Sequence, residues 1–213
     1  MLEKLHERLQ AHAPRRLGLS LPQAAVLIPI VARPEPTLLF TRRAAHLKQH
    51  GGQVAFPGGK REPDDPDLLT TALREAQEEI ALPPRRVRLL GRLGDLISLH
   101  GIRVTPFVGL IPADLPLRPE LGELDSIFEV PLTVFLDDQR SHTDVITVNG
   151  RPLYVPSYQA GEHVIWGLSS MMLVELLAVG FERPISLDRA PDDSRLHYRP
   201  EARQPVFDDS SDA

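Results

Sequence analysis

A glycine pair followed by a helix that carries three glutamates constrains this chain more than any other feature. Gly58 and Gly59 close a loop just upstream of the helix. At about 100° of rotation per residue, Glu75, Glu78 and Glu79 fall within an arc of about 100°. Carboxylates at this density repel one another unless cations neutralise them. The spacing therefore indicates a divalent metal and the glycines indicate a phosphate, whereas the alternative is a solvated acidic helix face.

The residues around the glutamates support a helix. Apolar residues recur there at helical spacing and predict a buried stripe formed by Leu69, Ala72, Leu73, Ala76 and Ile80. Asp65 is a suitable N-cap, because Pro66 then takes the first helical position and Asp67 lies in the first turn. Pro83 and Pro84 end the helix.

The run Arg74-Glu75-Ala76-Gln77-Glu78-Glu79 resembles the core of the Nudix box, the signature of Nudix hydrolases. Arg74 lies four residues before Glu78, so we expect it to orient that glutamate rather than to contact substrate. Pro66 stands where the usual spacing of the family places a glutamate. The candidate substitutes are Asp64, Asp65 and Asp67. Ala81 stands where the family commonly has a glycine.

An upstream segment narrows the resemblance to one branch of the family. Residues 38–44 (LLFTRRA) and 47–59 (LKQHGGQVAFPGG) are similar to the motif of the coenzyme A pyrophosphatases. Shorter similarities follow at 104–109, 129–132 and 165–168. The resemblance implies hydrolysis of the pyrophosphate bond of coenzyme A and its derivatives, giving 3′,5′-ADP and 4′-phosphopantetheine species. The alternatives are a Nudix hydrolase of ADP-ribose or another nucleoside diphosphate derivative, and a non-catalytic Nudix-fold binding module.

The resemblance also implies roles for individual residues. Mg²⁺ or Mn²⁺ would be bound by Glu75 and Glu79, with Glu78 sharing or bridging and Gly59 adding a backbone carbonyl. The general base is either a glutamate of the box or Glu123, for which the alternative is an exposed loop carboxylate. The candidate catalytic residues are Arg74, Glu78 and Glu123.

A basic cluster before the glycines is suited to binding phosphate. It consists of Arg42, Arg43 and Lys48. The alternative is that these side chains cap helices or pair with surface carboxylates. Gly58 and Gly59 either approach the substrate closely or only form turns. The five residues together are the candidate substrate-binding set.

Composition excludes several classes of function. A formal net charge of −5 gives no reason to expect a nucleic-acid partner. The absence of cysteine excludes disulfides and thiolate metal sites. No apolar run reaches membrane-spanning length, and residues 1–10 are too charged for a signal peptide, so we expect a cytoplasmic protein without a membrane partner. The resemblance also allows a homodimer, which is common in the superfamily.

The remaining pattern predicts an α/β fold. Candidate strands span 24–32, 37–41, 87–93 and 103–111, and Asn149-Gly150 turns a hairpin over 145–155. Pro29 favours a bulge or an edge position for the first strand. A last helix starts at Ser169 or Ser170 and stops at Gly180. We expect an N-terminal helix or extension at 1–20, a Nudix-type α/β/α sandwich with a mixed β-sheet at 21–185, and a partly disordered tail at 186–213.

Overall fold

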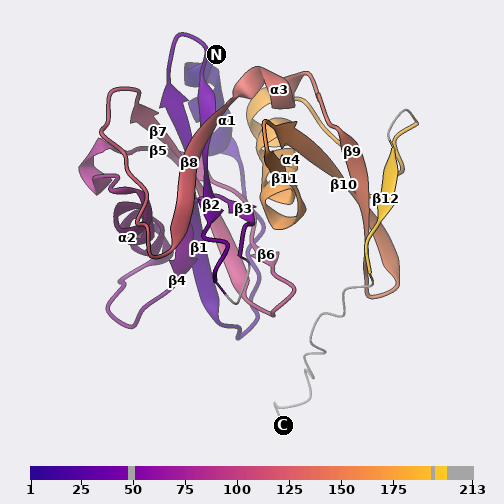
Figure 1. Cartoon of the computed structure of the whole chain (residues 1–213), viewed down its shortest axis with the longest axis horizontal. Helices are drawn as coiled ribbons and strands as arrows, with labels where there is room; N and C mark the ends of the chain where they lie inside the picture. The colour runs from indigo at the N-terminus through magenta and orange to yellow at the C-terminus, as the bar shows by residue number, and fades with distance from the viewer. Residues whose placement is uncertain (48–50, 193–194, 201–213) are drawn as a thin grey trace.

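Helix α4 (Gly167–Phe181) lies between two β-sheets in the computed structural model of the chain (Figure 1). The structure describes residues 1–47, 51–192 and 195–200. The first sheet contains β1 (Gln23–Ala32), β2 (Thr37–Arg43), β3 (Val54–Ala55), β4 (Gly58–Lys60), β5 (Arg88–Arg92), β6 (Leu96–Ile97), β7 (Arg103–Pro112) and β8 (Leu124–Pro131). The second contains β9 (His142–Val148), β10 (Arg151–Ala160), β11 (His163–Ile165) and β12 (Leu196–Tyr198). The other helices are α1 (Leu2–Ala11), α2 (Leu68–Ile80), the 3₁₀ turn η1 (Pro84–Arg86) and α3 (Leu132–Leu136).

The first sheet is mixed, as predicted. Its strands run in the order β3-β2-β1-β7-β5, with β4 beside β1, β6 beside β7 and β8 beside β2. Strand β1 is parallel to β7 and antiparallel to β2. The second sheet has the order β11-β10-β9-β12. All four strands predicted for the first sheet are present, and the α/β class is confirmed.

Both faces of the first sheet are covered by helices. Alternate residues of a strand point to opposite faces. Leu27 and Val31 of β1 therefore pack beneath α2, whereas Ile28 and Ile30 belong to the core beneath α1 and α4. Figure 1 shows α2 on one side of the sheet and α4 on the other. Burial on both faces explains why β1 is a continuous apolar run rather than an alternating one.

Pro29 lies in a central strand, so the prediction of an edge position was wrong. The register explains how the proline is tolerated. On one side β1 pairs with β4 through Ala24–Val26 and with β2 through Ile30 and Val31, and Pro29 falls between these two partners. On the other side the parallel ladder with β7 continues past it, opposite Gly109. The missing N–H of the proline therefore leaves both antiparallel pairings intact.

Helix α2 starts later than predicted. Its N-cap is Asp67, whose carboxylate accepts a hydrogen bond from Thr70 N at 2.7 Å. The prediction that Asp65 caps this helix was wrong, because its carboxylate is buried and hydrogen-bonds to Arg74 instead. The helix ends with Ala81 in the left-handed conformation, at φ 55°. This conformation explains why the family commonly has a glycine there.

Helix α4 does not stop at Gly180 as predicted, nor does a serine cap it. It begins after Trp166 and continues to Phe181, with Glu182 in the left-handed C-cap conformation. Gly180 is instead a contact point with α1, because a Cβ there would collide with the Leu5 side chain. Helix α1 is thus part of the core. Across the described ranges, no helix is both long and apolar enough to span a membrane.

The predicted hairpin of the second sheet is confirmed. Asn149 and Gly150 both have positive φ between β9 and β10, as a tight hairpin turn requires. Beyond residue 186, the described part of the chain contains β12, which pairs in parallel with β9. The boundaries at 20 and 185 remain predictions.

Candidate active site

Helix α2 presents its glutamates to the glycine strand β4. Glu79 is only 5% exposed, and its Oε2 accepts a hydrogen bond from Gly58 N at 3.0 Å. A Cβ on Gly59 would lie 2.5 Å from Oε2 of Glu75. Gly58 in turn lies against β1, where a Cβ would collide with the backbone of Ala25. Both glycines therefore permit close approach of protein groups, and this approach fixes the two glutamates relative to β4.

The carboxylates at this site raise one another's pKa values. Burial, together with the charges of Glu75 and Glu123, raises the pKa of Glu79 to about 7, although the Gly58 N–H and Arg43 lower it. Burial also raises the pKa of Glu75. The nearest cationic atom described for Glu79 is Arg43 Nη1, 3.9 Å from Oε1. A cluster with this electrostatic imbalance favours binding a cation.

Arg74 connects the helix to the preceding loop. Its Nε and Nη2 each donate to one oxygen of Asp65 at 3.0 Å. Its Nη1 donates to Glu78 Oε2 at 3.0 Å and lies 3.1 Å from Glu75 Oε1. The predicted Arg74–Glu78 pair is thus present. Asp65 also accepts a hydrogen bond from Thr71 Oγ1 at 2.9 Å, so a buried and fixed carboxylate holds the arginine. Sequence analysis considered Asp65 only as a helix cap or as a substitute for the missing glutamate.

Glu123 lies in the loop directly before β8. Its charge contributes to the raised pKa values of both Glu75 and Glu79. The side chain is exposed. The loop is fixed by its backbone, since Ala44 N donates to the Glu123 carbonyl at 2.8 Å and Glu120 N donates to the Glu79 carbonyl at 2.8 Å. Glu78 is likewise exposed, with 58% of its side chain accessible, and pairs with Arg74 Nη1.

The basic cluster is divided between two sides of β2. Arg43 points toward Glu79, whereas Nη1 of Arg42 lies 3.6 Å from Oε1 of Glu162 on the other side of the sheet. Alternation along the strand requires this separation. Only Arg43 of the pair lies beside the glutamates. Lys48 lies outside the described residues.

Arg42 lines a cavity of about 200 Å³ between β2 and the second sheet. The other residues around it are Gly51, Gly52, Gln53, Val54, Glu162, His163, Val164 and Trp166. His163 stacks on Phe128 with ring centroids 4.0 Å apart. Sequence analysis noted the similarity at 165–168 but did not assign this segment to a site, because β11 joins the cavity only through tertiary packing.

A helix that presents several carboxylates to a glycine strand, in an α/β fold with a mixed sheet, is suited to the metal-assisted hydrolysis of phosphorus anhydrides. The NUDIX domain matches residues 21–131. The chain belongs to this family, the Nudix hydrolases, which generally use divalent metals.

Two relatives are each 49% identical to the chain over 156 residues, covering 72% of the chain and 77% of the relative. Both are called "Uncharacterized Nudix hydrolase NudL", from Yersinia pestis (strain Pestoides F) and Yersinia pseudotuberculosis serotype O:1b (strain IP 31758). Among solved structures, a Nudix hydrolase from M. smegmatis, RenU, is similar at 22% identity with a TM-score of 0.46, covering 55% of this chain and 74% of that one. A C. elegans Ap4A hydrolase binary complex is similar at 17% identity with a TM-score of 0.45, covering 52% and 80%.

Proposed function

We propose that the chain hydrolyses the pyrophosphate bond of coenzyme A and its derivatives with Mg²⁺ or Mn²⁺. The reaction gives 3′,5′-ADP and a 4′-phosphopantetheine species. The observation that carries the chemistry is the cluster of Glu75, Glu79 and Glu123 against β4. The coenzyme A preference rests on the sequence similarity of residues 38–59. Within this segment Arg43 lies beside Glu79, and Arg42 lines the cavity on the other side of β2.

The residues present suit a hard divalent cation. Buried or half-buried carboxylate oxygens with raised pKa values indicate anionic ligands that lack a sufficient counter-charge. Glu75 and Glu79 would hold the ion, with Gly59 adding its carbonyl and Glu78 acting from the rim. When bound, such an ion neutralises phosphate charge and lowers the pKa of a coordinated water.

The protein's own groups then have separate tasks. Arg74 fixes the glutamates through its pairs with Glu78 and Asp65. Arg43 is the candidate phosphate ligand, because its buried Nε has no hydrogen-bond partner within the described ranges. Glu123 is the candidate general base, since it is exposed and near the cluster. Arg42 would contact a part of the substrate on the other side of β2.

Product analysis tests this function. The chain is incubated with coenzyme A or with ADP-ribose, each with Mg²⁺, with Mn²⁺ or with a chelator, and the products are identified by mass spectrometry. We expect metal-dependent release of 3′,5′-ADP, with a higher kcat/KM for coenzyme A. Equal or better cleavage of ADP-ribose would contradict the proposed preference for coenzyme A and identify ADP-ribose as the better substrate. Binding of either compound without cleavage would support the non-catalytic module.

A further inference from the structure

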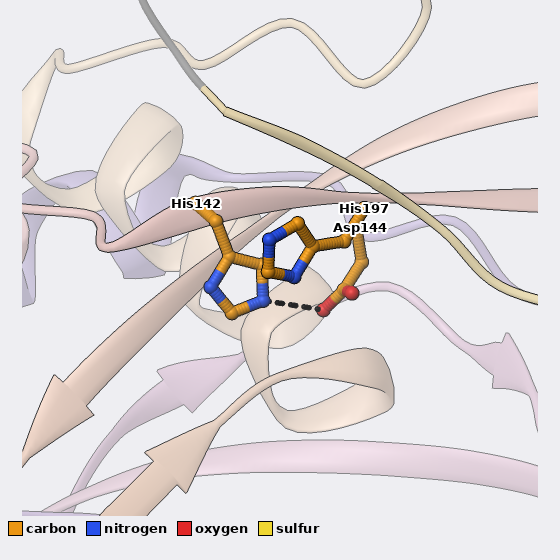
Figure 2. Close-up of side chains that lie close together, drawn as sticks. All are labelled: His142, Asp144 and His197. Atoms are coloured by element: carbon orange, nitrogen blue, oxygen red, sulfur yellow. Dashed lines mark ion pairs between the residues drawn. The ribbon is translucent and has the colours of Figure 1, made fainter.

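The second sheet gathers two histidines and an aspartate on one of its faces. His142 and Asp144 are two residues apart on β9, so their side chains share a face. Strand β12 pairs in parallel with β9 and places His197 opposite Asp144. One ligand atom from each residue lies within 4.8 Å of the others. Figure 2 shows the two imidazole rings overlapping beside the carboxylate.

One nitrogen of this group has no hydrogen-bond partner. His142 Nε2 is buried and accepts or donates no hydrogen bond within the part of the chain that the structure describes. It lies 3.5 Å from Oδ2 of Asp144, the pair joined by the dashed line in Figure 2. The ring is fixed on its other side, where Nδ1 is 3.0 Å from Ser141 Oγ. A buried ring nitrogen that makes no hydrogen bond, and has only this longer contact with a carboxylate, is unfavourable unless something binds it.

Hydrogen bonds from two neighbours orient Asp144 and leave the side of its carboxylate that faces His142 able to bind an ion. Asp144 is fully buried, and Arg199 Nε donates to its Oδ1 at 2.6 Å. Ser157 Oγ donates to Oδ2, the oxygen that faces His142. An oxygen that accepts one hydrogen bond retains a further lone pair. Groups that hold a ligating carboxylate in this way are typical of metal sites in proteins.

A salt-bridge network that only ties β12 to β9 is the simpler interpretation. In that network Arg199 Nε lies 2.6 Å from Oδ1 of Asp144 and forms the main ion pair of the aspartate. His142 Nε2 lies 3.5 Å from Oδ2, and this buried nitrogen makes no hydrogen bond within the described ranges. The network alone therefore leaves one buried polar atom unsatisfied, whereas a bound ion would use it.

The distances suit a tetrahedral ion. Zn–N bonds of about 2.0–2.1 Å place neighbouring ligand atoms about 3.3 Å apart. The separation of 3.5 Å between His142 Nε2 and Asp144 Oδ2 is close to this value. His197 is exposed on β12 and its ring stacks on His142, so to ligate the same ion it must turn out of this stacking. Two imidazoles and one carboxylate suit Zn²⁺ better than Mg²⁺, which favours oxygen ligands.

We infer that His142, Asp144 and His197 form a second metal site, for Zn²⁺ or a similar transition-metal ion, apart from the glutamate cluster of α2. The ion joins β12 to β9. Strand β12 leads into Arg199, whose guanidinium lies 4.5 Å from the ring centroid of Trp166. Trp166 lines the cavity of Arg42. Occupancy therefore stabilises one wall of that cavity without contributing to the chemistry on the other side of the sheet.

Metal content tests this inference directly. The full chain is stripped with a chelator, dialysed against Zn²⁺ with an excess of Mg²⁺, and analysed for bound zinc by mass spectrometry. His197→Ala removes one ligand at an exposed position and leaves the core unchanged. We expect this variant to bind about one equivalent of zinc less than the unaltered chain. His100→Ala replaces an exposed histidine in the loop between β6 and β7, and this matched control should bind as much zinc as the unaltered chain.

Glu79→Gln separates the two sites. This variant should still lose about one equivalent of zinc when His197→Ala is added. With Co²⁺ as the probe, the absorption bands of a tetrahedral ion should appear in the unaltered chain and disappear in His197→Ala. Equal zinc content in the unaltered chain and His197→Ala, or loss of the histidine-dependent equivalent in Glu79→Gln alone, would overturn the inference.

Discussion

Arg74 binds Asp65 through two parallel hydrogen bonds, both of 3.0 Å, from Nε to Oδ1 and from Nη2 to Oδ2. The aspartate is buried in the loop between β4 and α2, and the arginine continues to Glu75 and Glu78 on the helix. The loop and the helix are therefore joined at the point where the glutamates are presented. Bidentate pairs of this kind fix orientation as well as contributing energy.

Replacement of Asp65 by Asn should affect both stability and hydrolysis. The change leaves Arg74 without its buried partner, and we expect a loss of about 3 kcal/mol in the free energy of unfolding. Misplacement of the arginine and its glutamates should lower kcat/KM by about tenfold or more. Chemical denaturation and steady-state kinetics measure the two effects. Asp64→Asn, at an exposed neighbouring position, should change neither quantity.

The same pair predicts how stability changes in acid. Hydrogen bonds from Arg74 lower the pKa of Asp65 below its ordinary value of 3.8. A lowered folded-state pKa contributes stability that is complete above the ordinary value and disappears as the pH falls below it. The unaltered chain should therefore lose stability more steeply below about pH 4 than Asp65→Asn. Parallel curves from denaturation at several pH values would contradict this assignment.

Glu79→Gln should keep the fold and lose hydrolysis. The amide oxygen of glutamine can still accept the hydrogen bond from Gly58 N, whereas the anionic metal ligand is removed. We expect kcat/KM to fall by about a hundredfold or more, as for the loss of an interaction of several kcal/mol. Glu35→Gln, in the exposed turn after β1, is the control. Near-full turnover in Glu79→Gln would exclude Glu79 as a ligand.

Mg²⁺ affinity should rise with pH. Since burial raises the pKa of Glu79 from 4.5 to about 7, the carboxyl must lose a proton to bind metal. Affinity measured by calorimetry should therefore increase up to about pH 7 and level off above it. A raised pKa also means that, without metal, the contribution of this group to stability falls as the pH rises between 4.5 and about 7. Arg43→Gln removes a cation that lowers this pKa, so its affinity curve should shift to higher pH.

Ala81→Gly should stabilise the chain. Ala81 ends α2 with φ at 55°, a conformation that is unfavourable for any residue with a Cβ. Glycine has more conformational freedom in the unfolded chain, and this offsets part of the stabilisation. We therefore expect a net increase of about 0.5–1 kcal/mol in the free energy of unfolding. For a protein of this size the Tm should rise by about 1–4 °C. An unchanged or lower Tm in thermal unfolding would contradict the prediction.

Local periodicity was sufficient to predict the parts of the site that lie within one element. The glutamates of α2 and the partner of Arg74 at Glu78 follow from helical spacing alone. Asp65 was predicted as a cap because its neighbours resemble a helix start, and only the folded loop shows that Arg74 competes for its carboxylate. Gly180 was likewise predicted as a helix stop from its local sequence. Its actual role, contact with Leu5, joins two residues that lie far apart in the chain, so local sequence could not predict it. His142-x-Asp144 is readable as one strand face, but His197 joins it only through the pairing of β12.

The positions of Arg42 and Arg43 have a consequence for engineering. These adjacent residues of β2 point to opposite sides of the sheet, so a substitution at one position does not require a substitution at the other. If the Arg42 cavity holds part of the substrate as proposed, exchange of β11 or of residues around that cavity would alter the choice of substrate and leave the glutamate cluster unchanged. A library confined to that wall would explore new diphosphate esters on an unchanged hydrolytic centre.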